Sequence, residues 1–467
     1  MENWSIAACE VILLAGASVV GWGSREFWRV PRRLWLPALL VVVLLAVGLA
    51  QLVPLPASLW KACGAERYTM YERAARAEAL LHTDAYRRDP FSAEAEKPLP
   101  PENWTPRTPK APAWIPPSFT PPATFRALLA LAAGLCLILL LERLAEEGRD
   151  ALRRLAWLVG GLGLFVALAA LAEFQDKART TILWVRPSAR AAGAFGPFVN
   201  PNHGAAFVNL AVPLLYYLIW RLSCATARRS DRFGLRLLCL GLFALHVAVL
   251  FASHSQGSLL ALLFYPLAWL ANGALHPSRP WRLALAWVFL AALLCGGALA
   301  AWSGLVSDRG RLRLGANVPA HGFALGHGLG SFEPQFAAES ADLPFFPQMR
   351  NTHLENEYLQ AFFEGGILPA LAALATGVGV VYLAARLSLE AHAAFWLAPV
   401  LVGETLHAAV DFTAHVFPIV GALLLVCIVG MVALEVQLDA GGSAHKQRRR
   451  HGGPRRDEVT GEREAAG

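Results

Sequence analysis

Charged residues are scarce in this chain: they make up 16% of its 467 residues, whereas 56% are apolar. That balance excludes a soluble globular protein of this length. Cysteine is also sparse, and the seven cysteines are scattered, five of them inside apolar stretches (Cys9, Cys136, Cys239, Cys295 and Cys427). Cys224 lies in a basic stretch, and only Cys63 is expected on the outer side of the membrane. We therefore predict no intramolecular disulfide on that side and no CxxC metal site.

Long apolar stretches account for most of the chain. A helix needs roughly 20 apolar residues to cross about 30 Å of hydrocarbon. Four stretches with almost no charge meet this length: Leu34 to Val53, Phe125 to Leu141, Leu283 to Trp302 and Phe417 to Val436. The sequence predicts about eleven transmembrane helices, centred near residues 14, 44, 133, 163, 212, 244, 265, 293, 376, 401 and 426. We therefore predict an all-α, polytopic integral membrane protein, with a multi-span domain over 1–438 and a disordered basic tail over 439–467.

The distribution of arginine predicts the orientation of these helices. Every second loop between predicted spans is basic, at 25–33, 143–154, 221–236, 279–282, 386 and 446–450. Lys and Arg are enriched in short loops that stay in the cytoplasm. This pattern places the N-terminus outside and the C-terminus in the cytoplasm. The net charge of +7 then reflects loops facing anionic membrane lipids, so we predict no nucleic-acid partner.

Three long loops remain on the outer side, over 54–122, 174–202 and 304–364. The first is rich in proline and shows no convergent set of acids, bases or ligands. We therefore interpret it as a segment that covers and packs against the rest of the protein. The second contains Arg190 and then Asn200, Asn202 and His203 directly before an apolar helix. A guanidinium suits a diphosphate, because it stays charged and binds oxygens bidentately. The alternative for Asn200 or Asn202 is a helix N-cap.

The third outer loop is richest in polar residues. Arg311 and Arg313 come first, and Gly326, Gly328 and Gly330 follow. Since no Rossmann strand precedes these glycines, we expect a tight turn whose backbone N–H groups face an anion rather than a nucleotide site. The loop ends with further polar residues: Arg350, His353, Glu355, Asn356 and Tyr358. His353 and Asn356 would share one face of a helical turn.

These residue types fit glycosyl transfer from a polyprenyl diphosphate. Diphosphate is already a good leaving group, so the enzyme must mainly neutralise its charge and supply a base for the acceptor hydroxyl. Arginine supplies the first function, and histidine or glutamate the second. The reference pKa of histidine, about 6.5, lies near working pH. Lone loop histidines are more often structural, so the neighbouring Arg and Asn residues carry this interpretation.

Six short motifs occur in order between the predicted spans: Leu52-Val-Pro-Leu-Pro56, Gly193-Ala-Phe195 through Asn200-Pro-Asn202-His203, Ser255-Gln-Gly257, Gly326-His-Gly-Leu-Gly330-Ser-Phe332, Asn356-Glu-Tyr358-Leu with Glu364-Gly-Gly, and His407-Ala-Ala-Val-Asp411-Phe. In these the chain resembles the O-antigen ligase and polymerase family of lipopolysaccharide and polysaccharide biosynthesis. The resemblance implies a GT-C-like helical fold in the bacterial inner membrane with periplasmic active loops. It further implies an undecaprenyl-diphosphate-linked glycan as donor, lipid A-core or another glycan as acceptor, and neither a metal ion nor a cofactor.

The resemblance also implies residue roles. Arg190, Arg311 and Arg313 would bind the diphosphate, and His353 would be the base. The family often has His directly before the Asn of the loop motif, where this chain has Glu355, so either His353 acts from a shifted turn or Glu355 takes its role. Substrate contacts are expected from six further residues: Asn200, Asn202, His203, Arg350, Asn356 and Tyr358. Gln256 stands where the family often has an arginine, which removes one expected cation.

Ionisable residues inside apolar stretches need partners. His407 and Asp411 are four residues apart near the end of a predicted span, so we expect them to pair, with a proton relay as the alternative. For the whole chain, two enzymatic alternatives stay open: a ligase that joins a glycan to an acceptor, and a polymerase that extends a lipid-linked chain. A secondary transporter is the third, disfavoured because we find no internal repeat.

Overall fold

The computed structural model of the chain describes residues 2–22, 29, 31–56, 58–59, 114–118, 120–174, 180–183, 186–187, 194–266, 326–333, 353, 356–390, 394–409, 411 and 413–451. Its long helices are α1 (Glu2–Trp22), α2 (Trp35–Leu52), α6 (Pro121–Glu147), α7 (Arg149–Phe174), α8 (Pro201–Ala225), α9 (Arg229–Ala252), α16 (Ile367–Glu390) and α18 (Phe417–His451). Shorter helical elements are α10 (Gln256–Leu262), α15 (Glu357–Gly365), η3 (Ala394–Leu397), α17 (Ala398–His407) and η4 (Thr413–His415).

Two short antiparallel ladders accompany the helices. β1 (Leu55–Pro56) pairs with β2 (Trp114–Ile115), and β3 (Thr181–Ile182) pairs with β4 (Arg186–Pro187). Each strand has only two residues. The described chain is therefore mostly helical, as the sequence predicted.

Within the described ranges, seven helices are long and apolar enough to cross a membrane: α2, α6, α7, α8, α9, α16 and the first part of α18. They correspond to the spans predicted near 44, 133, 163, 212, 244, 376 and 426. The span predicted near 14 falls in α1, whose apolar stretch is shorter, Glu10–Val19. Near 401 the structure has α17, whose ten residues are too few to cross about 30 Å of hydrocarbon. The span predicted near 293 lies outside the described residues.

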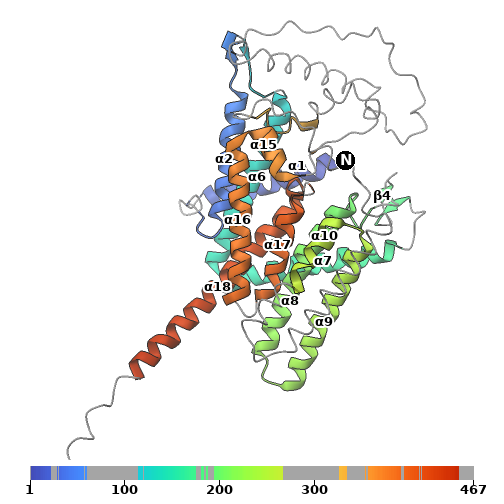
Figure 1. The fold of residues 1–467 in the computed structure, drawn as a ribbon, viewed down its shortest axis with the longest axis vertical. Helices are drawn as coiled ribbons and strands as arrows, with labels where there is room; N and C mark the ends of the chain where they lie inside the picture. Colours follow the sequence, from blue (N-terminus) through green and yellow to red (C-terminus); the bar gives the residue numbers. More distant parts are fainter. Residues whose placement is uncertain are drawn as a thin grey trace, which may run out of the picture.

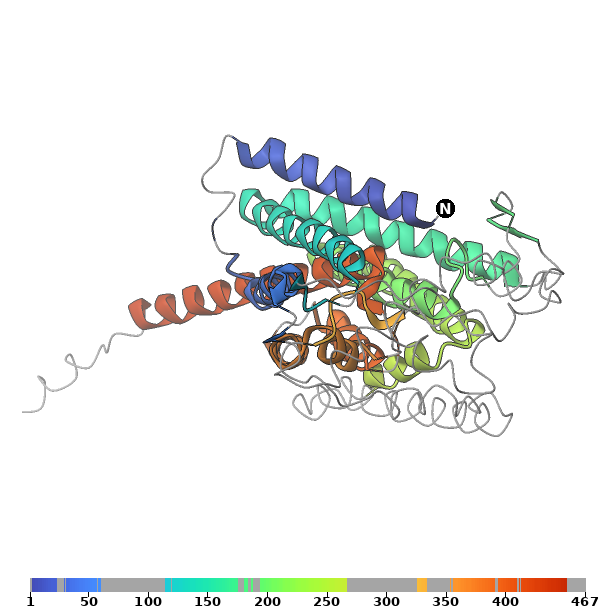
Figure 2. The same ribbon diagram turned by 90° about the horizontal axis from the view of Figure 1, so that it is seen from above.

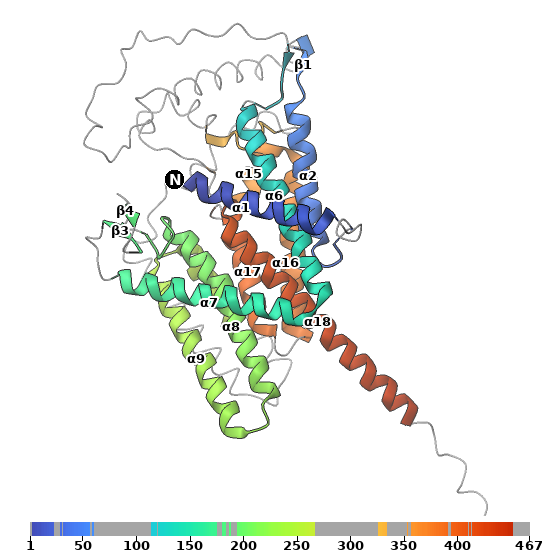
Figure 3. The same cartoon turned by 180° about the vertical axis from the view of Figure 1, so that it is seen from behind.

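Helix α8 forms the centre of the hydrophobic core. Figure 1 shows it between α7, α9 and α10, and it also packs against α17 and α18. All its residues from Gly204 to Ile219 are buried. Figures 2 and 3 show α1 and α7 running across the direction of α2 and α16 rather than along it. The fold is thus a helical body in which one fully enclosed helix organises its neighbours.

Several helix ends follow from local sequence. Pro121 and Pro201 occupy first-turn positions of α6 and α8, where a missing N–H costs no helical hydrogen bond. Asn200 caps α8, because its side chain accepts the Asn202 N–H at 3.0 Å. Asn356 caps α15 in the same way, through the Leu359 N–H at 3.0 Å. Two of the predicted substrate-binding asparagines therefore set where helices begin.

Helix α18 continues well past its apolar part. The sequence predicted a disordered tail from residue 439, whereas the structure describes helix as far as His451. The segment after Pro418 contains no further proline before His451, and it ends in Lys, Gln and Arg residues with good helix propensity. Figure 1 shows this end of α18 projecting away from the other helices. Residues 452–467 of the predicted tail lie outside the described residues.

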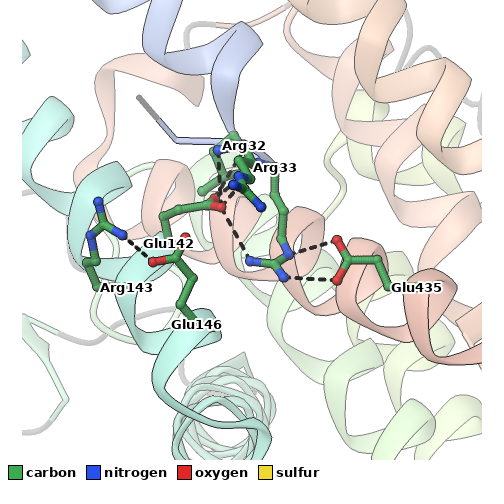
Figure 4. Close-up of polar contacts among 7 residues, drawn as sticks. Arg32, Arg33, Glu142, Arg143, Glu146 and Glu435 are labelled. Carbon is green, nitrogen blue, oxygen red and sulfur yellow. Dashed lines mark hydrogen bonds and ion pairs between the residues drawn. The ribbon is translucent and has the colours of Figure 1, made fainter. Parts of the chain in front are cut away.

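The buried carboxylate of Glu142 and the Arg33 side chain connect α2, α6 and α18 near the start of α2 (Figure 4). Glu142 of α6 is only 2% exposed, and it accepts the backbone N–H groups of Arg32, Arg33 and Leu34. These N–H groups lie just before Trp35, the first residue of α2, and a negative charge near a helix N-terminus is favourable. The Arg33 guanidinium then bridges Glu142 at 3.3 Å and Glu435 of α18 at 2.9 Å.

Replacing Glu142 by alanine should destabilise the protein by about 3 to 5 kcal/mol, because it removes the acceptor of three backbone N–H groups and leaves Arg33 with Glu435 alone of these two carboxylates. The matched control is Glu146→Ala, which breaks an exposed ion pair with Arg143 one turn further along α6. That change should cost less than about 1 kcal/mol. Thermal unfolding of both variants in detergent measures the difference, and equal effects would contradict this assignment.

Candidate functional site

The segment 326–332 is a glycine loop that folds onto α15 and the end of α2. Gly326, Gly328 and Gly330 have φ angles of 65°, 114° and 74°, a region that side chains rarely tolerate. The surroundings also leave no room at Gly328, where an added Cβ would approach the Ser118 Oγ to 2.6 Å. The glycines therefore shape a tight turn, as the sequence predicted.

The loop does not offer its N–H groups to a ligand, so that expectation was wrong. Each backbone N–H from residue 327 to 332 has an acceptor inside the protein: His327 to Phe363 O, Gly328 to Glu364 O, Leu329 to Gln51 Oε1, Gly330 and Phe332 to the Glu364 carboxylate, and Ser331 to Gly328 O. The anion that this turn binds is thus the side chain of Glu364. The reason lies in tertiary packing, since Glu364 follows the loop by more than 30 residues.

Glu364 is the centre of that arrangement. It is 5% exposed and accepts the Gly330 N–H at 2.7 Å, the Phe332 N–H at 3.3 Å and the Gln360 amide at 3.1 Å. Burial raises the pKa of Glu364, while nearby His415 and these hydrogen bonds oppose the rise. Gln51 at the end of α2 completes the junction, because its amide donates to the Glu364 backbone oxygen at 2.8 Å.

A second set of ionisable groups lies at the end of α17 and the start of α8. Glu404, His407, Asp411 and His203 form an alternating chain of carboxylates and imidazoles. The successive separations are 3.6 Å from Glu404 to His407, 3.5 Å from His407 to Asp411 and 3.8 Å from Asp411 to His203. The first three residues are at most 3% exposed. The predicted pairing of His407 with Asp411 is confirmed, and it extends to two further groups.

Glycines allow this row of ionisable side chains to pack closely between α10 and α17. An added Cβ at Gly257 would fall 2.0 Å from the His407 ring, and one at Gly403 would fall 2.4 Å from Ala261. Helices α10 and α17 can therefore approach closely, with the imidazole lying directly on the backbone of α10. This explains the glycine of the Ser255-Gln-Gly257 motif as a packing requirement.

A third group of side chains joins these two sets. Asn356 Nδ2 donates to Ala409 O at 2.7 Å, and the Glu357 N–H donates to Ala408 O at 2.8 Å, which docks the start of α15 on the end of α17. Glu357 then pairs with His415 of η4 at 2.9 Å. His415 lies 3.4 Å from the Gln360 amide, so it connects to Glu364. The His353 ring lies against His415, with 4.6 Å between ring centroids.

The two adjacent imidazoles have opposite electrostatic surroundings. Burial lowers the pKa of His353, and His415 and His203 lower it further, to about 3. Burial also lowers the pKa of His415, but the Glu357 and Glu364 carboxylates outweigh it and raise the pKa to about 9. At neutral pH the site therefore holds one charged and one uncharged histidine in contact.

No family model, curated protein or solved structure matches this chain. What the site can do therefore follows from its own residues. Within the described ranges, no group of three or more His, Cys, Asp or Glu side chains is arranged to hold a metal ion. The expectation of a metal-free reaction stays a prediction.

The predicted site residues divide into two groups. We call His203, His353, His407 and His415, with the carboxylates of Glu357, Glu404 and Asp411, the histidine cluster. Two predicted residues, His203 and His353, belong to it, and Asn356 and Tyr358 lie beside it. Asn200 and Asn202 begin the helix that carries His203. Tyr358 donates to Thr405 O at 3.0 Å, which packs α15 on α17; a substrate contact from it stays a prediction. Five predicted residues lie outside the described residues: Arg190, Arg311, Arg313, Arg350 and Glu355.

Sequence reasoning missed His415, Glu357 and the role of Glu364. Glu357 is adjacent to Asn356 in a motif that was singled out, and His415 follows the predicted His407 and Asp411 pair by only a few residues. Both positions therefore carried a weak signal. Their pairing joins residues more than 50 positions apart, and nothing local in the sequence indicates it.

Proposed function

We propose that the chain is a multi-pass membrane glycosyltransferase of the O-antigen ligase type. It transfers a glycan from undecaprenyl diphosphate to the hydroxyl of an acceptor such as lipid A-core, on the periplasmic side of the bacterial inner membrane. The observation that carries the proposal is an uncharged, half-buried histidine, His353, held against a charged one in a cluster at the helix ends. An imidazole that is unprotonated at working pH can accept the proton of an acceptor hydroxyl.

The helix directions support the proposed orientation. One end of the helical body carries the glycine loop and the histidines. Helices α2 and α9 terminate there, and helices α6, α8 and α16 begin there. The opposite helix ends carry arginines: Arg33, Arg143, Arg221, Arg236 and Arg386. Arginine favours the cytoplasmic side. This separation supports a periplasmic histidine cluster. The GT-C-like arrangement and the count of about eleven spans stay predictions.

The proposed reaction has few steps. The acceptor oxygen attacks the anomeric carbon and forms the new glycosidic bond, while the bond from that carbon to the diphosphate oxygen breaks. The electron pair leaves with the diphosphate, whose charge the side chains of Arg190, Arg311 and Arg313 are proposed to neutralise. The proton of the acceptor hydroxyl passes to the His353 imidazole, with the Glu355 carboxylate as the alternative base.

Purified protein should transfer glycan from undecaprenyl diphosphate to lipid A-core in the presence of a metal chelator. His353→Asn or Glu355→Gln, whichever residue is the base, should lower the rate by about 10² to 10⁴-fold. Arg311→Gln should lower it as well. The matched control is His254→Asn, an exposed histidine at the end of α9, which should leave the rate unchanged.

The outcomes distinguish the alternatives. Product of growing length on the lipid carrier, without transfer to lipid A-core, would assign the polymerase reaction instead. If no donor and acceptor pair reacts while reconstituted protein moves a solute across vesicles, the enzyme proposal fails and a transporter takes its place.

A further inference from the structure

Two imidazoles from different parts of the chain stack on each other at the proposed active site. His353 lies before α15, and His415 ends η4, yet their ring planes meet at 57° with centroids 4.6 Å apart. Two like-charged imidazolium rings at this distance would repel each other strongly. The contact is therefore stable only if the two rings differ in charge or are both neutral.

The position of His415 is fixed by the Glu357 carboxylate. Its Nδ1 lies 2.9 Å and 3.1 Å from the two Glu357 carboxylate oxygens, and its Nε2 lies 3.4 Å from the Gln360 amide. Glu357 is in turn anchored through its backbone N–H to Ala408 O at 2.8 Å. A ring held in this way has a set orientation and a permanent counter-charge.

We propose that His415 is a positioning residue for His353: paired with Glu357, it holds a fixed positive charge against the His353 ring, orients that ring and keeps it unprotonated. The inference rests on the proposed function, in which His353 takes the proton of the acceptor. His415 itself touches no reacting atom. It acts through His353.

Four carboxylates of the described residues lie around the site. From α15, Glu357 pairs with His415, and Glu364 accepts hydrogen bonds from the glycine loop and Gln360. From the segment after α17, Asp411 lies between His407 and His203. From α17, Glu404 faces His407. The centroid of the His415 ring lies 4.6 Å from that of His353, so a positive charge on His415 acts on His353 at close range.

This arrangement has a chemical consequence. A histidine that stays neutral across the working pH range is always ready to accept a proton, but it binds that proton weakly while His415 is charged. Negative charge on the donor diphosphate, growing as the bond breaks, would offset the His415 charge and raise the proton affinity of His353. Proton transfer is then favourable only when the donor is in place.

The test measures the protonation of each histidine without relying on activity. Diethyl pyrocarbonate modifies unprotonated imidazole, and peptide mass spectrometry reports the rate at each histidine between pH 4 and pH 9. In the unmodified full-length protein, His353 should react at a nearly constant rate down to about pH 4, given its pKa of about 3. His415 should be protected below about pH 9.

His415→Gln should move the pH of half-maximal His353 reactivity upward by about one unit or more, because one unit of pKa is a tenfold change in the protonation ratio. Glu357→Gln should make His415 reactive near neutral pH. The matched control, Glu390→Gln, breaks an exposed ion pair with Arg386 at the far end of α16 and should change neither histidine. An unchanged His353 midpoint in His415→Gln would overturn the proposal. If that variant does not fold, an unchanged His415 reactivity in Glu357→Gln would overturn it equally.

Transfer assays separate this inference from the proposed function. In His415→Gln, the pH midpoint of the acidic limb of the kcat/KM profile should rise by as many pH units as the His353 midpoint. The plateau value of kcat/KM should fall by less than about tenfold. An equal loss at every pH would mean that His415 only supports the fold, and would overturn the positioning role. If the midpoint moves as expected while no glycan donor reacts in any protein, the histidine pair stands and the glycosyltransferase proposal fails.

Discussion

Glu364→Ala is expected to destabilise the protein by about 3 to 5 kcal/mol, since it leaves two backbone N–H groups of the glycine loop and the buried Gln360 amide without this acceptor. Those groups belong to Gly330 and Phe332, at 2.7 and 3.3 Å from the carboxylate. The Gln360 amide loses the same partner. Thermal unfolding in detergent measures the loss of stability.

Two comparisons make the effect of Glu364 specific. Glu364→Gln keeps one acceptor oxygen, and burial already raises the pKa of this carboxyl, so the neutral amide should cost clearly less than alanine. Glu390→Ala removes a partly exposed carboxylate that pairs with Arg386, and should lower the unfolding temperature much less than Glu364→Ala. If Glu364→Ala unfolds at the same temperature as Glu390→Ala, the carboxylate does not organise the loop.

Asp411→Ala is expected to have an effect of similar size, about 3 to 5 kcal/mol, because it removes the carboxylate between two imidazoles in a buried chain. Asp411 is 3% exposed and lies 3.5 Å from His407 and 3.8 Å from His203. Loss of this anion leaves His407 with Glu404 as its remaining carboxylate partner in the chain. The measurement is again the thermal unfolding of the detergent-solubilised variants.

A double-mutant cycle tests whether the chain acts as a unit. Asp411→Ala and His407→Gln in one protein should cost less than the sum of the single changes, by about 1 to 3 kcal/mol, since neighbours in one network couple. Asp411→Ala combined with Glu146→Ala is the control, and these two distant changes should add. An additive result for the His407 cycle would show that the two side chains do not stabilise each other.

Helix existence could be predicted from the sequence because it depends on local composition. Apolar runs near 44, 133 and 426 are long enough to identify helices without any partner, and the structure has α2, α6 and α18 there. The length of a helix was harder to predict where tertiary contacts end it. α17 stops after ten residues, because Glu404 and His407 are taken up in a polar chain beside α10 rather than by a continuing apolar helix.

Single residues of the site were predictable, but their partners were not. The sequence singled out His353, Asn356 and the glycines of 326–330 as unusual, and all lie near the histidine cluster. It could not show that Glu364 fills the turn or that His415 stacks on His353. Those contacts join α15 to segments 30 to 60 residues away, and their formation depends on how α2, α8 and α17 pack.

By itself, the sequence determined that the chain is a helical protein with long apolar stretches, and that a histidine and three glycines lie in polar segments between those stretches. These properties follow from composition and order along the chain. Only the tertiary structure decided which charges meet. Side chains within 4 Å of each other shift one another's protonation and stability, and the packing of α8, α15 and α17 brings these groups to that distance.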